Sequence, residues 1–83
     1  MNLASCRLLT DASIEAITNH CVALGTLNIS KCKLLTDQSI ISCNNNLSSL
    51  KSLWTNLNPL ITLNAVNMLS KKCNVLFITK IIV

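Results

Sequence analysis

Two stretches of the chain are nearly identical: residues 6–14 read CRLLTDASI and residues 32–40 read CKLLTDQSI. They differ only at their second and seventh positions, and the offset between them is 32 − 6 = 26 residues. A period of roughly 20–50 residues is typical of proteins built from stacked repeats. A unit this short cannot bury its apolar side alone. The period therefore predicts units that stack on one another and present surface rather than a catalytic cleft.

The same offset relates apolar positions along the rest of the chain. Leu24, Leu27 and Ile29 recur as Leu50, Leu53 and Thr55, and then as Leu76, Thr79 and Ile81. The third unit departs from the pattern, with Asn58 in place of the cysteine and Leu63 in place of the aspartate. About three units fill residues 1–83, which we expect to form one array that is a fragment of a longer one.

A short strand is expected near the middle of each unit. Leu27 and Ile29 alternate with Asn28 and Ser30, so two apolar side chains should face the core and two polar ones solvent. Stacking the units places these strands side by side in a parallel sheet, about 4.8 Å apart.

A helix is expected after each strand, on the opposite, convex side. Thr36 or Asp37 caps the second helix, since either side chain can accept a bond from a free N–H of the first turn. Asp11 is given the same capping role in the first unit. One apolar stripe follows at Ile40, Cys43 and Leu47. Residues 44–46 are three asparagines with poor helix propensity, which makes the last turn of this helix doubtful.

One alternative is a single long helix after residue 46. Leucines recur there at spacings of three and four, at Leu47, Leu50, Leu53, Leu57, Leu60 and Leu63. Pro59 would interrupt such a helix, and residues 56–59 (NLNP) are typical of a turn. The long helix also leaves the 26-residue period unexplained.

All five cysteines fall on repeat positions. Cys6 and Cys32 end strands, Cys21 and Cys73 end helices, and Cys43 takes an apolar helix position. A free thiol serves well as a small buried apolar group, so we expect reduced and mostly buried cysteines. There is no Cys-x2-Cys pair of the zinc-binding kind. A Cys6–Cys32 disulfide is the alternative, because stacked turns would bring these residues together.

Composition and charge argue against several functions. The net charge is +4, and the seven Lys/Arg are spread along the chain, which indicates a solvated surface rather than a nucleic-acid site. The acids Asp11, Glu15 and Asp37 and the lone His20 form no catalytic constellation, and no cofactor or metal motif is present. The longest apolar segment, residues 75–83, is too short to span a membrane. No secretory signal is visible, so we expect an intracellular protein. Because no catalytic constellation is present, we also expect that it is not an enzyme.

The resemblance to a known family rests on residues 21–32, which follow the pattern Cys-x-x-Leu-x-x-Leu-x-Ile-x-x-Cys and precede Leu35-Thr36-Asp37. In these motifs the chain resembles the cysteine-containing leucine-rich repeats of F-box/LRR proteins and of relatives of the yeast antagonist of mitotic exit. The resemblance is strong in residues 3–43 and weak after Pro59. It implies an α/β leucine-rich-repeat solenoid of about three 26-residue strand–helix units, with a parallel sheet on the concave face.

The resemblance also implies a role in ubiquitin-dependent protein catabolism. Repeats of this family hold the target of a Skp1–cullin–F-box ubiquitin ligase, while a separate F-box binds the ligase core. No F-box can be placed here, since Met1 already aligns with Leu27, so the chain is expected to supply only the protein-binding half. Two alternatives stay open: a truncated or degenerate repeat remnant, and a regulatory repeat protein that acts without an F-box.

We expect a protein partner to bind the strand face. The outward positions are Asn28, Ser30 and Lys31 in one unit and Trp54, Asn56 and Leu57 in the next. Trp54 is the strongest candidate, because exposed tryptophans are typical interface anchors. The alternative is that Trp54 packs beneath a neighbouring strand.

Residues 75–83 predict an open sheet edge. The segment is β-prone, carries one charge and contains no proline. Such an edge invites pairing with another chain, so we expect edge-to-edge self-association.

Overall fold

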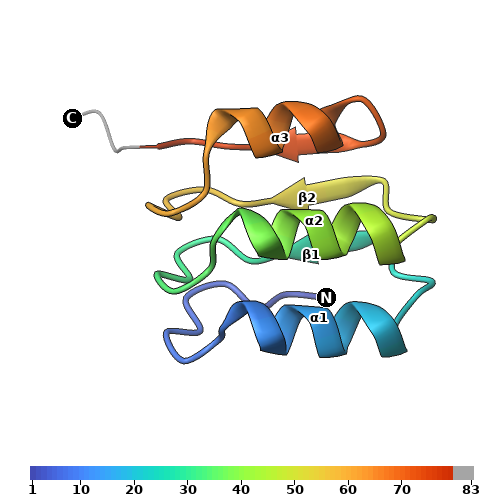
Figure 1. Cartoon of the computed structure of the whole chain (residues 1–83), viewed down its shortest axis with the longest axis horizontal. Helices are drawn as coiled ribbons and strands as arrows, with labels where there is room; N and C mark the ends of the chain where they lie inside the picture. Colours follow the sequence, from blue (N-terminus) through green and yellow to red (C-terminus); the bar gives the residue numbers. More distant parts are fainter. Residues whose placement is uncertain (80–83) are drawn as a thin grey trace.

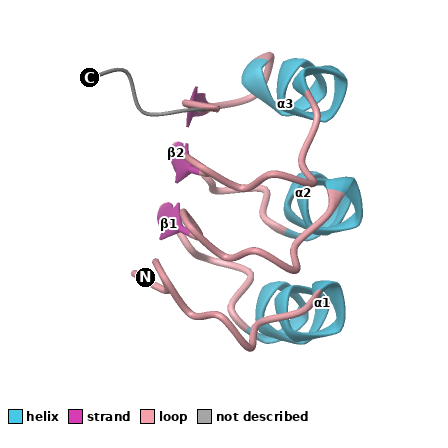
Figure 2. Cartoon of the chain, turned by 90° about the vertical axis from the view of Figure 1, so that its left-hand side faces the viewer, coloured by secondary structure: helices cyan, strands magenta, loops and turns pink. Residues whose placement is uncertain are grey.

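Helices and strands alternate along residues 1–79, the part of the chain that the computed structural model describes. The helices are α1 (Asp11–His20), α2 (Asp37–Asn46) and α3 (Leu63–Ser70), and the strands are β1 (Thr26–Asn28), β2 (Ser52–Trp54) and β3 (Asn74–Leu76). The strands form one parallel sheet in the order β1-β2-β3. Successive helices lie side by side (Figure 1), and all of them lie on one side of the sheet (Figure 2). The fold is a small α/β structure, as predicted.

A threonine directly precedes each helix. Thr10, Thr36 and Thr62 are the N-cap residues of α1, α2 and α3. Their hydroxyls accept hydrogen bonds from first-turn N–H groups of Ser13 (3.4 Å), Gln38 (3.2 Å) and Ala65 (3.4 Å). Of the two capping residues weighed for α2, the structure selects the threonine.

The aspartates after these threonines bond to the next unit, so the prediction that Asp11 and Asp37 cap their own helices was wrong. The Asp11 carboxylate accepts bonds from the N–H and hydroxyl of Thr36 (2.9 and 2.6 Å) and from the Ser39 hydroxyl (2.6 Å). Asp37 accepts from the N–H and hydroxyl of Thr62, both at 2.7 Å. Burial acts to raise the pKa of Asp11, but these hydrogen bonds outweigh it and hold the pKa below its usual value.

Helix α2 continues through the three asparagines to Asn46. The poor helix propensity of these residues therefore does not end the helix early, contrary to what the sequence suggested. The Asn46 amide donates to the Thr18 hydroxyl of α1 at 2.9 Å, and the Asn44 carbonyl accepts from the Lys72 ammonium at 2.8 Å. Contacts with both neighbouring units thus outweigh a weak local propensity.

The core lies between the sheet and the helices. Leu27 and Ile29 are fully buried, as their alternation predicts, and so are Leu53 and Thr55 in the next unit. The stripe formed by Ile40 and Cys43 on α2 and by Leu47 directly after it is fully buried. Because residues 52–54 form strand β2, the alternative of one long helix across this region was wrong.

The backbone conformation itself repeats every 26 residues, at Ser5 and in the turns that follow β1 and β2. Ser5, Lys31 and Leu57 all have positive φ, between 59° and 64°, which is uncommon for residues other than glycine. Each donates its N–H to a carbonyl of the following unit, at Ser30 (2.8 Å), Asn56 (2.9 Å) and Ile78 (2.6 Å). These inter-unit bonds stabilise a conformation that the side chains alone disfavour.

The predicted register of the third strand was wrong. Leu53 pairs with Val75, an offset of 75 − 53 = 22 residues, whereas the period placed Thr79 there. Four residues, 22–25, separate Cys21 from β1, and four, 48–51, separate Leu47 from β2, but Cys73 directly precedes β3. The missing loop accounts for the four-residue difference. The predicted register also placed Ile81 in this strand, but residues 80–83 lie outside the described part of the chain.

Asn58 replaces the repeat cysteine and fills the same turn with hydrogen bonds. Its amide donates to the carbonyl of Ile29 (2.9 Å) and the hydroxyl of Thr55 (2.6 Å), and its Oδ1 accepts from the N–H of Cys32 (2.8 Å). Cys32 makes the corresponding bond one unit earlier, from its Sγ to the Leu3 carbonyl at 3.3 Å. Asn58 therefore takes over the hydrogen-bonding role of the repeat cysteine, although its side chain differs.

The five cysteines are free, as expected, but they are less buried than the repeat pattern predicted. Cys32 and Cys43 are fully buried, Cys21 and Cys73 are half-buried, and Cys6 is exposed. Burial raises the pKa of Cys43 to about 12 and also raises the pKa values of Cys32 and Cys73. Protonation of these thiols fits a structural role.

Candidate interaction surface

The outer face of the sheet carries one row of side chains from successive strands. Asn28 pairs with Trp54, and Trp54 pairs with Leu76. An isolated parallel bridge between Asn2 and Asn28 adds a fourth position at the amino-terminal side. The helices lie behind the sheet and leave this face uncovered (Figure 2). The strand face is thus a continuous surface to which every unit contributes.

Trp54 lies at the centre of this row, beside a hollow. Its neighbours Leu53 and Thr55 are fully buried, while Trp54 is half-buried on the opposite side of the strand. The hollow, of about 290 Å³, is lined by Met1, Asn2, Thr26, Asn28 and Trp54. Trp54 therefore occupies the outward position expected of an interface anchor, with part of its side chain exposed.

The side chains of three predicted partner-binding residues already form hydrogen bonds with the backbone. The side-chain oxygens of Asn28, Ser30 and Asn56 accept from the N–H groups of Ser30 (3.0 Å), Asn56 (2.9 Å) and Ile78 (2.8 Å). Ser30 is buried, contrary to the outward orientation that strand alternation predicts. The reason is that the chain turns after Asn28, where β1 ends, so simple alternation no longer applies.

The other two predicted residues lie in the positive-φ turns. Lys31 is exposed, and Leu57 is half-buried one unit further along. The structure thus places Asn28 and Trp54 together at the hollow and the other predicted residues at the ends of the strands. Sequence reasoning missed Met1, Asn2 and Thr26 as lining residues, although the alignment of residues 1–3 with 27–29 contained the signal.

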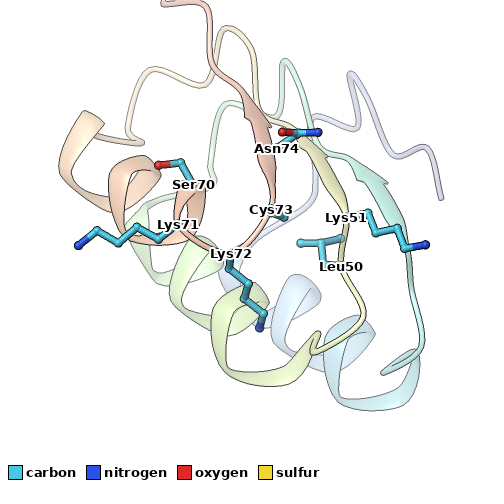
Figure 3. Close-up of a pocket in the computed structure, with 7 residues that line it drawn as sticks. All are labelled: Leu50, Lys51, Ser70, Lys71, Lys72, Cys73 and Asn74. Atoms are coloured by element: carbon cyan, nitrogen blue, oxygen red, sulfur yellow. The ribbon is translucent and has the colours of Figure 1, made fainter.

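A second hollow, of about 380 Å³, lies where α3 runs into β3 (Figure 3). Its lining includes Lys51, Lys71 and Lys72 around Cys73 and Leu50. The lysine side chains point away from one another and out of the hollow (Figure 3), and Lys72 donates to the Asn44 carbonyl. The hollow therefore has no point on which several cations converge.

Exposed leucines also recur with the 26-residue period, in the turns before the helices. Leu8, Leu34 and Leu60 are 90%, 50% and 54% exposed. A hollow of about 380 Å³ lies beside the first of them, lined by residues 6–9. These leucines contribute little to the core, and the repeat pattern could have identified them as a second surface feature.

Within residues 1–79, no three His, Cys, Asp or Glu side chains come together as a group that could hold a metal ion. Among the same residues, no helix has the length and apolar character needed to cross a membrane. No model of a known protein family matches the chain, and no curated protein matches it. A functional assignment must therefore start from the strand face.

Proposed function

We propose that the chain is a leucine-rich-repeat module that binds a protein partner on its strand face. The observation that carries this proposal is Trp54, half-exposed at the centre of an uncovered parallel sheet beside a hollow of about 290 Å³. A partly exposed aromatic side chain can contact partner side chains and bury a large apolar area. The amide groups of Asn2 and Asn28, beside the hollow, can donate hydrogen bonds to partner carbonyl groups.

The repeat architecture supports the proposal through bonds between units. Asp11 reaches Thr36 and Asp37 reaches Thr62, so each helix start is held by the preceding one. The parallel strands and the positive-φ turns recur with the same 26-residue offset up to β2. Stacks of this kind present extended binding surfaces that are characteristic of solenoid proteins.

The resemblance to F-box/LRR repeats narrows the proposed partner to a target of a ubiquitin ligase, with this chain as the recognition part. The ligase role rests on the resemblance alone and is tested separately. A coding sequence that continues upstream into an F-box would support it. An upstream sequence without one would leave a recognition module or an F-box-less regulator, and the ligase role would be lost.

Binding at the strand face is tested with peptides selected from a display library against the whole chain. Selected peptides should quench Trp54 fluorescence and should bind Trp54→Ala at least about tenfold more weakly, as for a moderate interface hot spot. Met68→Ala is the matched control, because Met68 is a large, partly exposed apolar side chain on α3, behind the sheet. Peptides that lose affinity for Met68→Ala but not for Trp54→Ala would place binding on the helices and contradict the proposal. Failure to select any peptide would favour a repeat remnant without a partner.

A further inference from the structure

The hollow beside Trp54 is lined by uncharged side chains, although the chain as a whole carries +4. The lining residues are Met1, Asn2, Thr26, Asn28 and Trp54. Because none of these side chains can act as a counter-ion, the hollow gives a charged group no compensation for the water that it would lose on binding. The hollow therefore favours an uncharged ligand.

The hydrogen-bond acceptors around the hollow are already engaged. The Oδ1 atoms of Asn2 and Asn28 accept from the backbone N–H groups of Ala4 and Ser30, both at 3.0 Å. Backbone carbonyls of the lining residues also accept hydrogen bonds, at 2.7–2.9 Å, in Met1, Thr26, Asn28 and Trp54. A ligand whose own N–H or O–H groups need acceptors therefore finds few of them here.

The groups left to meet a ligand are mainly donors. Since the oxygen of each asparagine side chain is held by the backbone, its NH2 group, with two N–H donors, is the part that a ligand can use. Trp54 adds one indole N–H and an aromatic surface, and Thr26 adds a hydroxyl. The partial positive charges of these N–H groups are complementary to carbonyl oxygens, and the indole is complementary to an apolar ring.

We propose, as a step that rests on the proposed partner-binding function, that the partner contacts this hollow with a proline-rich segment in the polyproline II conformation. Proline has no backbone N–H, so such a segment presents carbonyl acceptors and apolar rings. An extended strand would bring N–H donors, and a saccharide would bring hydroxyl donors, to a hollow whose acceptors are engaged. Grooves lined by aromatic side chains bind polyproline II segments, whose preformed helix loses little entropy on binding.

The spacing of the sheet agrees with the repeat of this helix. Asn2, Asn28 and Trp54 occupy paired positions on adjacent chain segments. At about 4.8 Å per step across the sheet, Asn2 and Trp54 lie about 9.6 Å apart. A polyproline II helix presents the same face every three residues, which at about 3.1 Å each is about 9.3 Å. A segment across the strands can therefore place a proline ring against Trp54 and a carbonyl one turn away at Asn2, with Asn28 between them.

Titration of the whole chain with decaproline, followed by the NMR signals of its N–H groups, tests the proposal. A Gly-Ser peptide of the same length is the control ligand, and both peptides are capped so that they are uncharged. Decaproline should shift the side-chain NH2 signals of Asn2 and Asn28 and the indole N–H signal of Trp54, the single tryptophan of the chain. The shifts should saturate with a dissociation constant of about 1 mM or below, and the Gly-Ser peptide should bind at least about tenfold more weakly.

A pair of asparagine variants separates the donor role of Asn28 from its structural role. Asn28→Asp keeps an oxygen for the Ser30 N–H but replaces the NH2 donors with an acceptor, so it should weaken decaproline binding at least about tenfold. Asn45→Asp adds the same charge at an exposed position of α2, behind the sheet, and should bind decaproline like the wild type.

Three results would overturn the proposal: no saturable shift with decaproline, equal binding of the Gly-Ser peptide, or unchanged binding in Asn28→Asp. Library peptides that bind through Trp54 without proline would also overturn it but would leave the proposed protein-binding function standing. Absence of any ligand at Trp54 would remove both. Should Asn28→Asp not fold, the shifts of the Asn2, Asn28 and Trp54 signals in the wild-type chain decide the question.

Discussion

Replacement of Asn58 by alanine should cost a large part of the stability of the fold. Asn58 is 3% exposed, and its side chain makes three hydrogen bonds, to Ile29, Thr55 and Cys32. The Thr55 hydroxyl accepts its bond from Asn58 and remains free to rotate, but the Cys32 N–H and the Ile29 carbonyl cannot leave their turn. Each buried group left without a partner costs about 1–3 kcal/mol, so with two such groups we expect a loss of about 2–6 kcal/mol for Asn58→Ala.

That loss is large for a chain of this size. At about 0.05–0.15 kcal/mol per residue, the expected free energy of unfolding of the 83-residue chain is about 4–12 kcal/mol. Asn58→Ala should therefore shift the urea midpoint strongly or leave a chain without a cooperative transition. Urea unfolding followed by circular dichroism and Trp54 fluorescence measures the difference.

Asn58→Cys is the informative companion variant, because the repeat itself places Cys32 at the equivalent position. A thiol can donate to the Ile29 carbonyl, as Cys32 donates to Leu3 at 3.3 Å. It is a poor acceptor for the Cys32 N–H, so about 1–3 kcal/mol should still be lost. Asn45→Ala, at an exposed position in α2, is the control and should change stability by no more than about 0.5 kcal/mol. A loss below about 1 kcal/mol for Asn58→Ala would refute the reasoning.

Three further predictions follow from burial and protonation. In the native chain, the exposed Cys6 should react first with a disulfide reagent and Cys43, whose pKa is raised to about 12 by burial, last; all five thiols should react after unfolding without reductant, and a smaller number would indicate a disulfide. The folded-state pKa of Asp11 is lowered, so its contribution to the stability of the fold is present above the unfolded-state pKa and is lost as pH falls through the folded-state pKa. Thermal melts should therefore show that acid lowers the stability of the wild-type chain more steeply than that of Asp11→Asn. Leu53→Ala removes a fully buried side chain from the central strand and should cost about 2–5 kcal/mol in urea unfolding, and a change below that range would mean that the core collapses to fill the space.

Short-range patterns of the sequence determined the elements and the main core. A threonine before a run with helical spacing supplies its own capping oxygen, so the starts of α2 and α3 could be read locally. The alternation around Leu27 and the stripe through Ile40 identified buried side chains, because each pattern depends only on the geometry of its own strand or helix. The outward position of Trp54 follows from the same alternation.

Only the tertiary structure decided what passes between the units. Asp11 bonds to Thr36, 25 residues away, and Asn58 to Ile29, 29 residues away, so neither role is visible in a local pattern. The 22-residue register of β3 arises because the strand pairs wherever its backbone meets β2, and a loop that is four residues shorter brings Val75 rather than Thr79 opposite Leu53. A repeat period predicts which residues are equivalent, whereas hydrogen bonds between neighbouring chain segments determine which of them meet.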